Sequence, residues 1–413
     1  MGSGVGGIGC EGWEASGRFG GAEVVEVILG CMFTKGFVHW GVGVGISTVL
    51  SMAMAGAAQQ GSTEPVVVAY VFPRDGALKV GQIDAHLITR INYAFANIKD
   101  GRMVTGSDFD GQNFATLTAL RKENPALTVL VSVGGWDWSG GFSDVALTEQ
   151  SRQVFIDSVM AFIKAYDLNG LDVDWEYPGM AGAGNRFRAE DGANFTTLLK
   201  ELRGRFDRET GSTHRRLYLS IAAGASSEYL EHTEMAKAQE FVDTVNLMAY
   251  DYSEAGSDRI ANHHAPLFVN PASPKKESAD ASVKAMEAVG VPSGKIVLGV
   301  PFYGHVWGDV GATNHGLFQR GKAVKGDWAS YESITSDLLK NGYVRYWDDA
   351  AKAPYLYDTQ KQIFVSYEDE ESLALKCDYI LRNKLAGVMF WEYSGDPSGT
   401  LLRMIDRALH SPQ

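Results

Sequence analysis

Three acidic residues alternate with three apolar residues in the stretch N-G-L-D-V-D-W-E-Y-P-G, which covers residues 169–179. The acidic residues are Asp172, Asp174 and Glu176. Strict alternation predicts a β-strand, because successive side chains of a strand point to opposite faces. Side chains on one face then follow each other about 6.6 Å apart. Three carboxyl groups on one face repel one another unless they share protons, so at least one should have a raised pKa.

Such a row favours acid–base chemistry, because one acid held protonated beside ionised ones can pass a proton to a bound substrate. The alternative is a strand whose acidic face simply looks into water, as in a one-sided antiparallel sheet. A solvated face normally mixes Thr, Lys and Ser with Glu, since like charges on one face destabilise the sheet. We therefore interpret the row as a functional site.

The elements around this row alternate between strands and helices. Apolar stretches of strand length cover residues 65–72, 88–98, 127–135, 171–176, 216–223, 241–251, 295–303 and 385–393. Helical stretches cover residues 114–124, 150–166, 191–208, 227–239, 278–289 and 399–409. Eight such units predict an α/β protein with a closed parallel sheet, the (β/α)8 or TIM barrel. A doubly wound open sheet is the alternative, but no glycine-rich phosphate-binding turn follows the first strand.

Catalytic residues of such barrels lie at the C-terminal ends of the strands. Glu176, Asp251, Trp391 and Trp136 all lie at or just past the ends of predicted strands. We therefore expect them to meet at one mouth of the barrel.

The segment of about 305–367, between the seventh and eighth strands, is too long for an ordinary loop. It contains short strand-like pieces at residues 344–347, 355–357 and 363–367, and a helical stretch near 331–341. These predict a small α+β insertion on the active face of the barrel.

The motifs of the chain resemble one family. Asp172-x-Asp174-x-Glu176, with Gly170 before it and Tyr-Pro after it, resembles the catalytic strand of the family 18 glycoside hydrolases, the chitinases, whose pattern is D-G-x-D-x-D-W-E. Residues 132–136, 247–251, 298–304 and 387–396 resemble the family's motifs on strands three, six, seven and eight. The insertion resembles that of the bacterial-type subfamily. Asn169 stands where the family usually has Asp; that position is not the proton donor, so we expect it to affect packing more than chemistry.

The resemblance implies a retaining hydrolysis of β-1,4-linked N-acetylglucosamine polymers in which the sugar's own acetamido carbonyl is the nucleophile. It implies Glu176 as general acid and then base, Asp174 as the group that orients the acetamido N–H, and Asp172 as its coupled partner. Tyr250 would donate a hydrogen bond to the acetamido oxygen. Further substrate contacts are implied for Tyr70, Phe95, Trp136, Met248, Asp251, Tyr303 and Trp391. Three aromatic residues either line the groove or pack in the interior: Trp138, Tyr303 and Trp307.

Two other functions remain open. One is an endo-β-N-acetylglucosaminidase that cuts glycoprotein glycans, although the insertion and Trp391 favour chitin. The other is a non-catalytic chitin-binding lectin. Lectin relatives lose the acid, whereas Glu176 is present, and without an acid the leaving group stays unprotonated.

Composition limits the partners. The 413 residues carry a net charge of −13, which argues against a nucleic-acid partner, because phosphate binding needs clustered Lys and Arg. Cys10, Cys31 and Cys377 show no metal-ligand spacing with histidine, and we predict no cofactor and no metal.

His263 and His264 lack an acidic partner at metal spacing and are interpreted as loop residues. Residues 368–372 (EDEES) are interpreted as the solvated start of a helix.

The N-terminal part, residues 1–60, is predicted to be an extension followed by a secretory signal peptide. Lys35 precedes an apolar run over residues 37–50, and small residues lead to Ala55 and Ala58, either of which fits a cleavage site. A membrane anchor is the alternative, but the run is short and glycine-rich. Met32 would be a better start for such a signal. We expect residues 61–413 to be one secreted catalytic domain, extracellular or periplasmic, monomeric and free of the membrane after cleavage.

Overall fold

The computed structural model describes residues 64–74 and 76–410. The predicted extension and signal peptide lie outside the described residues. No helix within the described part combines the length and the apolar character needed to cross a membrane.

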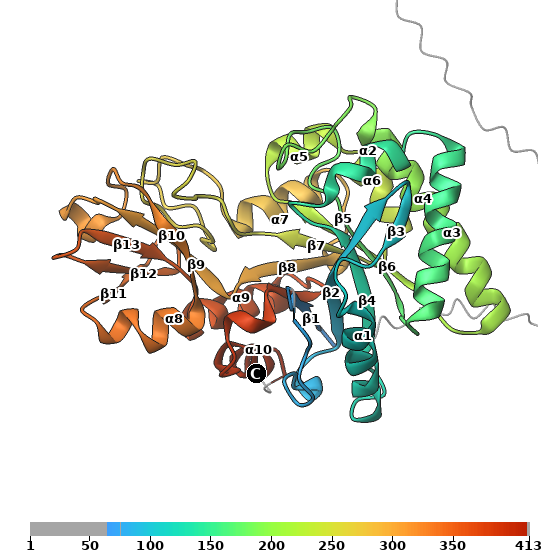
Figure 1. The fold of residues 1–413 in the computed structure, drawn as a ribbon. Coiled ribbons are helices and arrows are strands. Elements are labelled where there is room, and N and C mark those ends of the chain that lie inside the picture. Colours follow the sequence, from blue (N-terminus) through green and yellow to red (C-terminus); the bar gives the residue numbers. More distant parts are fainter. Residues whose placement is uncertain (1–63, 75, 411–413) are drawn as a thin grey trace, which may run out of the picture. The chain divides into compact units, whose positions relative to one another are not determined.

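Eight parallel strands form a closed barrel (Figure 1). They follow one another around the ring in chain order, and the last strand pairs with the first to close it. These strands are β1 (Val66–Val71), β2 (Arg90–Lys99), β4 (Thr128–Gly134), β5 (Gly170–Asp174), β6 (Tyr218–Gly224), β7 (Thr244–Met248), β8 (Ile296–Pro301) and β14 (Gly387–Trp391). A short strand, β3 (Arg102–Val104), pairs with the end of β2. Each of the eight predicted strands coincides with one barrel strand, so the predicted barrel is confirmed.

Helices connect the strands. The α-helices are α1 (Asp110–Ala119), α2 (Phe142–Val145), α3 (Glu149–Ala165), α4 (Asp191–Thr213), α5 (Ser227–His232), α6 (Met235–Ala238), α7 (Ala279–Ala288), α8 (Tyr331–Ser336), α9 (Glu370–Arg382) and α10 (Thr400–His410). The predicted helix at residues 227–239 is two short helices, because residues 233 and 234 leave the helical conformation between them.

The alternation on β5 decides which side chains enter the barrel. Trp175, just past the strand, stacks on Phe142 with ring centroids 5.2 Å apart and meets the ring of Phe195 edge-on at 5.8 Å. These two rings belong to α2 and α4, so the apolar face of the strand packs outward against helices. The opposite face, which carries Asp172 and Asp174, therefore points into the barrel.

The segment between β8 and β14 forms a second sheet of five strands, on the left of Figure 1. Its order is β10-β9-β13-β12-β11, built from β9 (Tyr303–Gly308), β10 (Lys322–Ser330), β11 (Val344–Asp348), β12 (Ala353–Asp358) and β13 (Ile363–Ser366). Trp307 is fully buried in its own apolar core with Tyr357 and Phe364. Of the two roles left open for Trp307, packing is the one that the structure supports.

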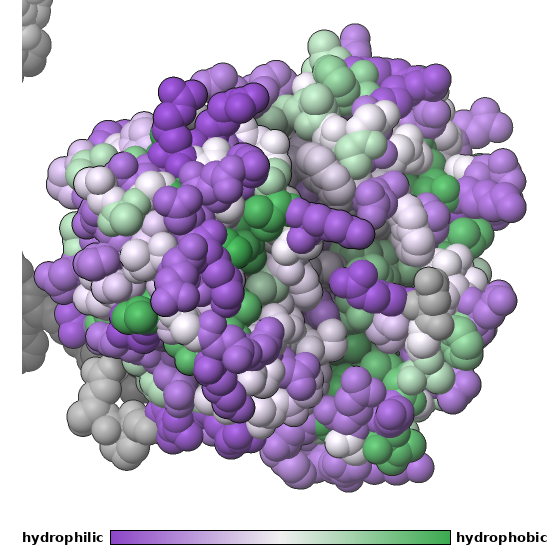
Figure 2. Space-filling model, turned by 60° about the vertical axis from the view of Figure 1, so that its left-hand side comes forward, coloured by the Kyte–Doolittle hydropathy of each residue, from purple (hydrophilic) through white to green (hydrophobic). Residues whose placement is uncertain are grey.

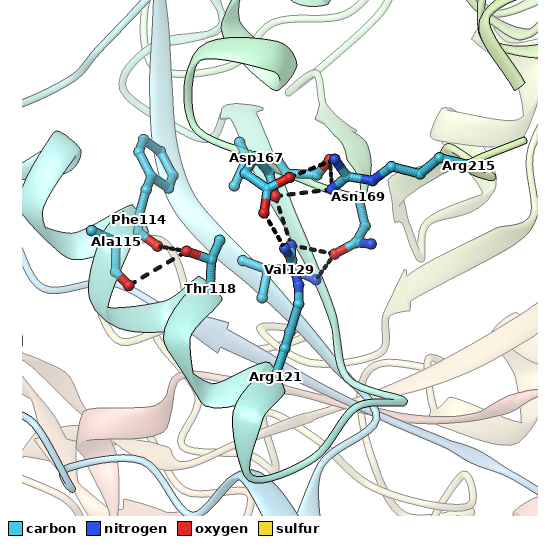
Figure 3. A network of polar contacts seen from close by, with 9 residues as sticks. Phe114, Ala115, Thr118, Arg121, Val129, Asp167, Asn169 and Arg215 are labelled. Atoms are coloured by element: carbon cyan, nitrogen blue, oxygen red, sulfur yellow. Dashed lines mark hydrogen bonds and ion pairs between the residues drawn. The ribbon is translucent and has the colours of Figure 1, made fainter. Parts of the chain in front are cut away.

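Asn169 lies immediately before β5, at the end of the strand opposite to the acids. Its side-chain oxygen accepts hydrogen bonds from the backbone N–H of Val129, at 2.9 Å, and from Arg121 (Figure 3). Arg121 and Arg215 also bind Asp167. An amide oxygen thus ties the start of β5 to its neighbours, which agrees with a packing role for this position.

The interpretation of residues 368–372 as a solvated helix start is wrong for Glu368. Asp369 does cap α9, accepting hydrogen bonds from the backbone N–H groups of Glu371 and Ser372. The side chain of Glu368, however, is 1% exposed and lies 2.9 Å from Nζ of Lys376, which is equally buried. Lys376 also donates to the carbonyl oxygen of Ala265 at 2.8 Å. The acidic run did not reveal this pair because Lys376 lies eight residues beyond Glu368, outside the run.

Replacing Lys376 alone should lower the stability of the fold more than replacing both members of this pair. We expect Lys376→Met to lower the free energy of unfolding by ~3–5 kcal/mol, because it leaves a buried carboxylate without a cation. The double variant Glu368→Leu/Lys376→Met should regain most of that loss. Urea unfolding of the wild type and the three variants of a double-mutant cycle measures both values. A loss below ~1 kcal/mol in Lys376→Met would contradict the pairing.

Candidate active site

Asp172 occupies the interior of the barrel and is fully buried. Its carboxyl group accepts hydrogen bonds from the hydroxyls of Tyr70, Ser132 and Ser220, at 2.8, 2.8 and 2.5 Å, and from the amide of Asn246 at 3.1 Å. Ser132 and Ser220 lie directly beside Asp172 in the registers of the neighbouring strands β4 and β6. Burial raises the pKa of Asp172, and the hydrogen bonds act in the opposite direction.

Asp174 is the last residue of β5 and has a different environment. It is 4% exposed, and its Oδ1 atom has no hydrogen-bond partner among the described residues. Burial, followed by the charges of Glu176 and Asp172, raises the pKa of Asp174 well above its ordinary value. Both causes favour the protonated form of Asp174.

Glu176 lies two residues beyond the end of the strand, which stops earlier than predicted. Burial raises its pKa to about 7; the charges of Asp251 and Asp137 act in the same direction, and a hydrogen bond with Tyr177 opposes them. A carboxyl group with this pKa can both give and take a proton near neutral pH. The row thus has the raised pKa values that were predicted, but burial, not repulsion between the three acids, is their largest cause.

The S-x-G-G motif on β4 holds this strand end in place. Gly134 has a φ of +106°, and a Cβ atom there would lie 2.2 Å from the carbonyl oxygen of Asp174. The backbone N–H of Gly135 donates to that same oxygen at 2.8 Å. Ser139 donates to it as well and accepts from the backbone N–H of Glu176 at 2.9 Å. The glycines let β4 approach closely enough for these contacts.

A cavity of about 740 Å³ opens at this end of the barrel. Figure 2 shows one face of the molecule hollowed near its centre, with hydrophobic residues visible in the hollow and mainly hydrophilic ones around it. Of the predicted site residues, all but Asp172 line the cavity: Tyr70, Phe95, Trp136, Asp174, Glu176, Met248, Tyr250, Asp251, Tyr303 and Trp391. Asp172 lies deeper in the barrel than Asp174 and does not line the cavity.

Trp391, the last residue of β14, is held by three other aromatic rings. It stacks on Phe95 with centroids 5.5 Å apart and planes 21° apart. Tyr70 and Phe72 pack against it at 5.8 and 5.7 Å. Such fixed rings offer a flat apolar surface to a ligand. Trp136, by contrast, is 52% exposed at the cavity wall.

Tyr250 contributes a neutral hydroxyl. Burial raises its pKa well above the ordinary value, and the charges of Asp251, Asp174 and Glu176 add to this. Within the described part of the chain, the one hydrogen-bond acceptor that the hydroxyl reaches is the Sδ atom of Met389, at 4.0 Å. Because thioether sulfur is a weak acceptor, the O–H remains available to a ligand.

Several cavity-lining residues were not predicted. Phe72 and His305 each lie two residues after a predicted one, Tyr70 and Tyr303, so the period of the strand would have indicated them. Trp138, whose role was left open, also lines the cavity. The other unpredicted residues include Asp137, Tyr177, Glu254, Lys275 and Glu277. The last three come from the long segment after β7, which has no periodicity to follow.

His263 and His264 lie in a loop, as interpreted, but each finds an acidic partner in a distant part of the chain. His263 lies 3.1 Å from Asp348, and Nδ1 of His264 lies 3.5 Å from Asp251. Nε2 of His305 is 2.9 Å from the same Asp251 oxygen. Burial alone would raise the pKa of Asp251, but the hydrogen bonds from His264 and His305 hold it below its ordinary range. Burial lowers the pKa of His264 to about 4, so its ring is neutral near pH 7.

The carboxyl row should cost the fold stability at alkaline pH. A folded-state pKa of about 7 against an ordinary 4.5 means that stability is lost as the pH rises through this interval, by at most ~3 kcal/mol. We expect the free energy of unfolding of Glu176→Gln to equal that of the wild type near pH 4.5 and to be larger above pH 7. Urea unfolding at a series of pH values measures it. Glu228→Gln, at an exposed position on α5, is the matched control and should change stability by less than ~0.5 kcal/mol. If Glu176→Gln were less stable than the wild type at every pH, ionised Glu176 would not be destabilising the fold.

Comparison with known proteins adds independent information. The family described as Glycosyl hydrolases family 18 matches residues 66–396. Chitinase A1 of Niallia circulans is 36% identical, over 87% of this chain and 61% of its own length. The structure of a family 18 N-acetylglucosaminidase from Paenibacillus barengoltzii is 40% identical with a TM-score of 0.77, over 83% of this chain and 99% of that one. Chitinase ChiW from Paenibacillus sp. str. FPU-7 is 38% identical with a TM-score of 0.80, over 84% of this chain and 33% of that one.

The chain thus spans 61% of the length of chitinase A1 and one third of ChiW. The matched region nevertheless contains all eight barrel strands, the acidic row and the cavity-lining aromatic residues. The chain belongs to family 18 of the glycosyl hydrolases.

Proposed function

We propose that this protein is a secreted chitinase that hydrolyses β-1,4 linkages between N-acetylglucosamine units with retention of configuration. The observation that carries the proposal is the pair Asp174–Glu176 at the cavity, in which the pKa of Asp174 is raised well above its ordinary value and that of Glu176 is raised to about 7. Chitinase A1 and ChiW, whose names describe this activity, support the substrate class.

The reaction needs a proton for the leaving oxygen and a nucleophile for the anomeric carbon. Protonated Glu176 donates to the glycosidic oxygen, and the C–O bond breaks. In this family the acetamido carbonyl oxygen of the sugar forms the new bond to the anomeric carbon, giving an oxazolinium ion. Glu176, now ionised, takes a proton from a water molecule that attacks the same carbon and opens the ring of the intermediate. No second enzyme carboxylate has to act as nucleophile, and no cofactor is required.

The other two acids prepare the substrate. Asp174 orients the acetamido N–H and, when it ionises, stabilises the positive oxazolinium ion. Its Oδ1 atom, which has no partner in the described part of the chain, leaves an acceptor position for that N–H. Asp172 couples to Asp174 from inside the barrel and is kept in place by its four hydrogen-bond donors. Tyr250 supplies the hydrogen bond to the acetamido oxygen.

Aromatic side chains bind the sugar faces. Trp391 forms the floor beneath the reacting sugar, with Phe95, Tyr70 and Met248 beside it. Tyr303 and Asp251 contact the sugar from the side of the second sheet, and Trp136 stacks a sugar further along the groove. We expect the mature protein to act as an extracellular or periplasmic monomer on chitin or its oligosaccharides.

A second candidate is an exo-acting N-acetylglucosaminidase. The relative from Paenibacillus barengoltzii, 40% identical over almost its whole length, is described as an N-acetylglucosaminidase. The same carboxyl row would serve that reaction. The two candidates differ in whether the cavity accepts the end of the sugar polymer or its interior. Product length separates the two candidates.

Glu176→Gln should abolish turnover while keeping binding. Loss of the general acid lowers kcat by about 10²–10⁴-fold, whereas the neutral amide has the same shape and leaves the binding cavity intact. Hydrolysis of an N-acetylglucosamine hexamer gives the rate, and calorimetric titration with the same hexamer gives the affinity. Glu228→Gln should behave as the wild type in both assays. If Glu176→Gln hydrolysed the hexamer at the wild-type rate, another residue would be the general acid.

The products of wild-type cleavage of the hexamer should be short oligomers, mainly dimers, released as the β-anomer. Retention follows because the sugar's own acetamido group and then water attack the anomeric carbon in succession. Chromatography that separates length and anomer, within the first minutes, measures both. Monomers as first product would support the second candidate, and α-anomers would contradict the mechanism. Absence of cleavage by a folded protein would favour glycoprotein glycans as the substrate or a lectin role.

A further inference from the structure

Two histidines without a role in the proposed reaction converge beside the cavity on Asp251, which is proposed to contact the sugar. Asp251 follows β7, His264 belongs to the long segment after it, and His305 lies in β9. One oxygen of Asp251 is 2.9 Å from Nε2 of His305 and 3.5 Å from Nδ1 of His264. The two imidazole rings are perpendicular, with centroids 5.1 Å apart. One ligand atom from each residue lies within 4.8 Å of the other two.

We propose that Asp251, His264 and His305 form a binding site for a divalent transition-metal ion of the Zn²⁺ class. Two imidazoles and one carboxylate are the donors that such ions prefer, whereas Mg²⁺ and Ca²⁺ prefer oxygen alone. Zn²⁺ bonds of about 2.0–2.2 Å in tetrahedral geometry place ligand atoms about 3.3 Å apart. The observed separations bracket that value, so small side-chain movements close the site.

The surroundings support the ligand set. The hydroxyl of Tyr303 lies 2.6 and 2.7 Å from the two oxygens of Asp251 and fixes the orientation of the carboxylate. His264 is fully buried, so its ring cannot swing away, while Asp251 and His305 line the cavity. The ion would thus keep an open position toward the cavity for water or a ligand. A neutral imidazole binds the ion through its unprotonated nitrogen, so the proton on Nδ1 of His264 moves to its Nε2 atom when the ion takes that position.

Occupation of this site would block the cavity. Asp251 is one of the residues proposed to contact the sugar, so the ion and the oligosaccharide compete for it. Zn²⁺ would therefore raise KM for the hexamer and leave kcat unchanged. This competition rests on the proposed function, whereas binding of the ion does not.

The binding test uses the full chain without an affinity tag, titrated with Zn²⁺ in a calorimeter and with Co²⁺ in a visible spectrometer. His264→Gln and His305→Gln each remove one ligand and should weaken binding at least about 10-fold. His263→Gln is the matched control, because this neighbouring buried histidine pairs with Asp348 and is not part of the site. It should bind as the wild type. Thiolate ligation of Co²⁺ by Cys10 or Cys31 would add an intense near-ultraviolet band, which separates those cysteines from the imidazole site.

Weaker binding in the two ligand variants, with the control unchanged, supports the site. Failure of the wild type to bind Zn²⁺, or unchanged binding in His305→Gln, overturns it. Should His264→Gln fail to fold, the His305→Gln variant, altered at the cavity wall, decides the question alone. If the wild type binds Zn²⁺ through these residues but never cleaves the hexamer, the proposed function fails while the metal site stands.

Discussion

Three carboxyl groups inside one barrel cannot all be ionised, and the rest of the site depends on how this conflict is resolved. Asp172 receives four hydrogen bonds, whereas one oxygen of Asp174 has no partner among the described residues. Hydrogen bonds thus oppose the rise in pKa that burial causes at Asp172, while burial and the neighbouring charges raise the pKa of Asp174 well above its ordinary value. The third acid, at the cavity, is left with a pKa of about 7. Burial, which normally makes charged groups costly, is here what prepares the chemistry.

The barrel supplies the positions that this arrangement needs. Hydroxyls on β4 and β6 face Asp172 because they share its register, and glycines on β4 allow the close approach that fixes the end of β5. The aromatic floor comes from the ends of other strands, so binding surface and acids meet although they are far apart in sequence. The second sheet begins with Tyr303, whose hydroxyl holds Asp251. It therefore contributes to the site as well as to the wall beside it.

The sequence predicted what short-range patterns determine. Alternation placed the acids on one face, and strand ends indicated Trp391, Asp251 and Trp136. The sequence alone could not predict contacts that form only when distant parts of the chain meet. These are the four donors to Asp172, the pairing of His264 with Asp251, and the burial of Glu368 against Lys376. The residues from the loop after β7, such as Lys275, follow no period at all. The predicted signal peptide lies outside the described residues and stays a prediction.

The most direct test of the account is the pH dependence of kcat/KM for hexamer hydrolysis by the wild-type protein. Because the free enzyme must carry the proton on its acid, kcat/KM should be high on the acidic side and fall about tenfold per pH unit above an apparent pKa near 7. A profile that stays flat to pH 9, or that rises through neutrality, would contradict the claim that burial keeps a transferable proton in this row.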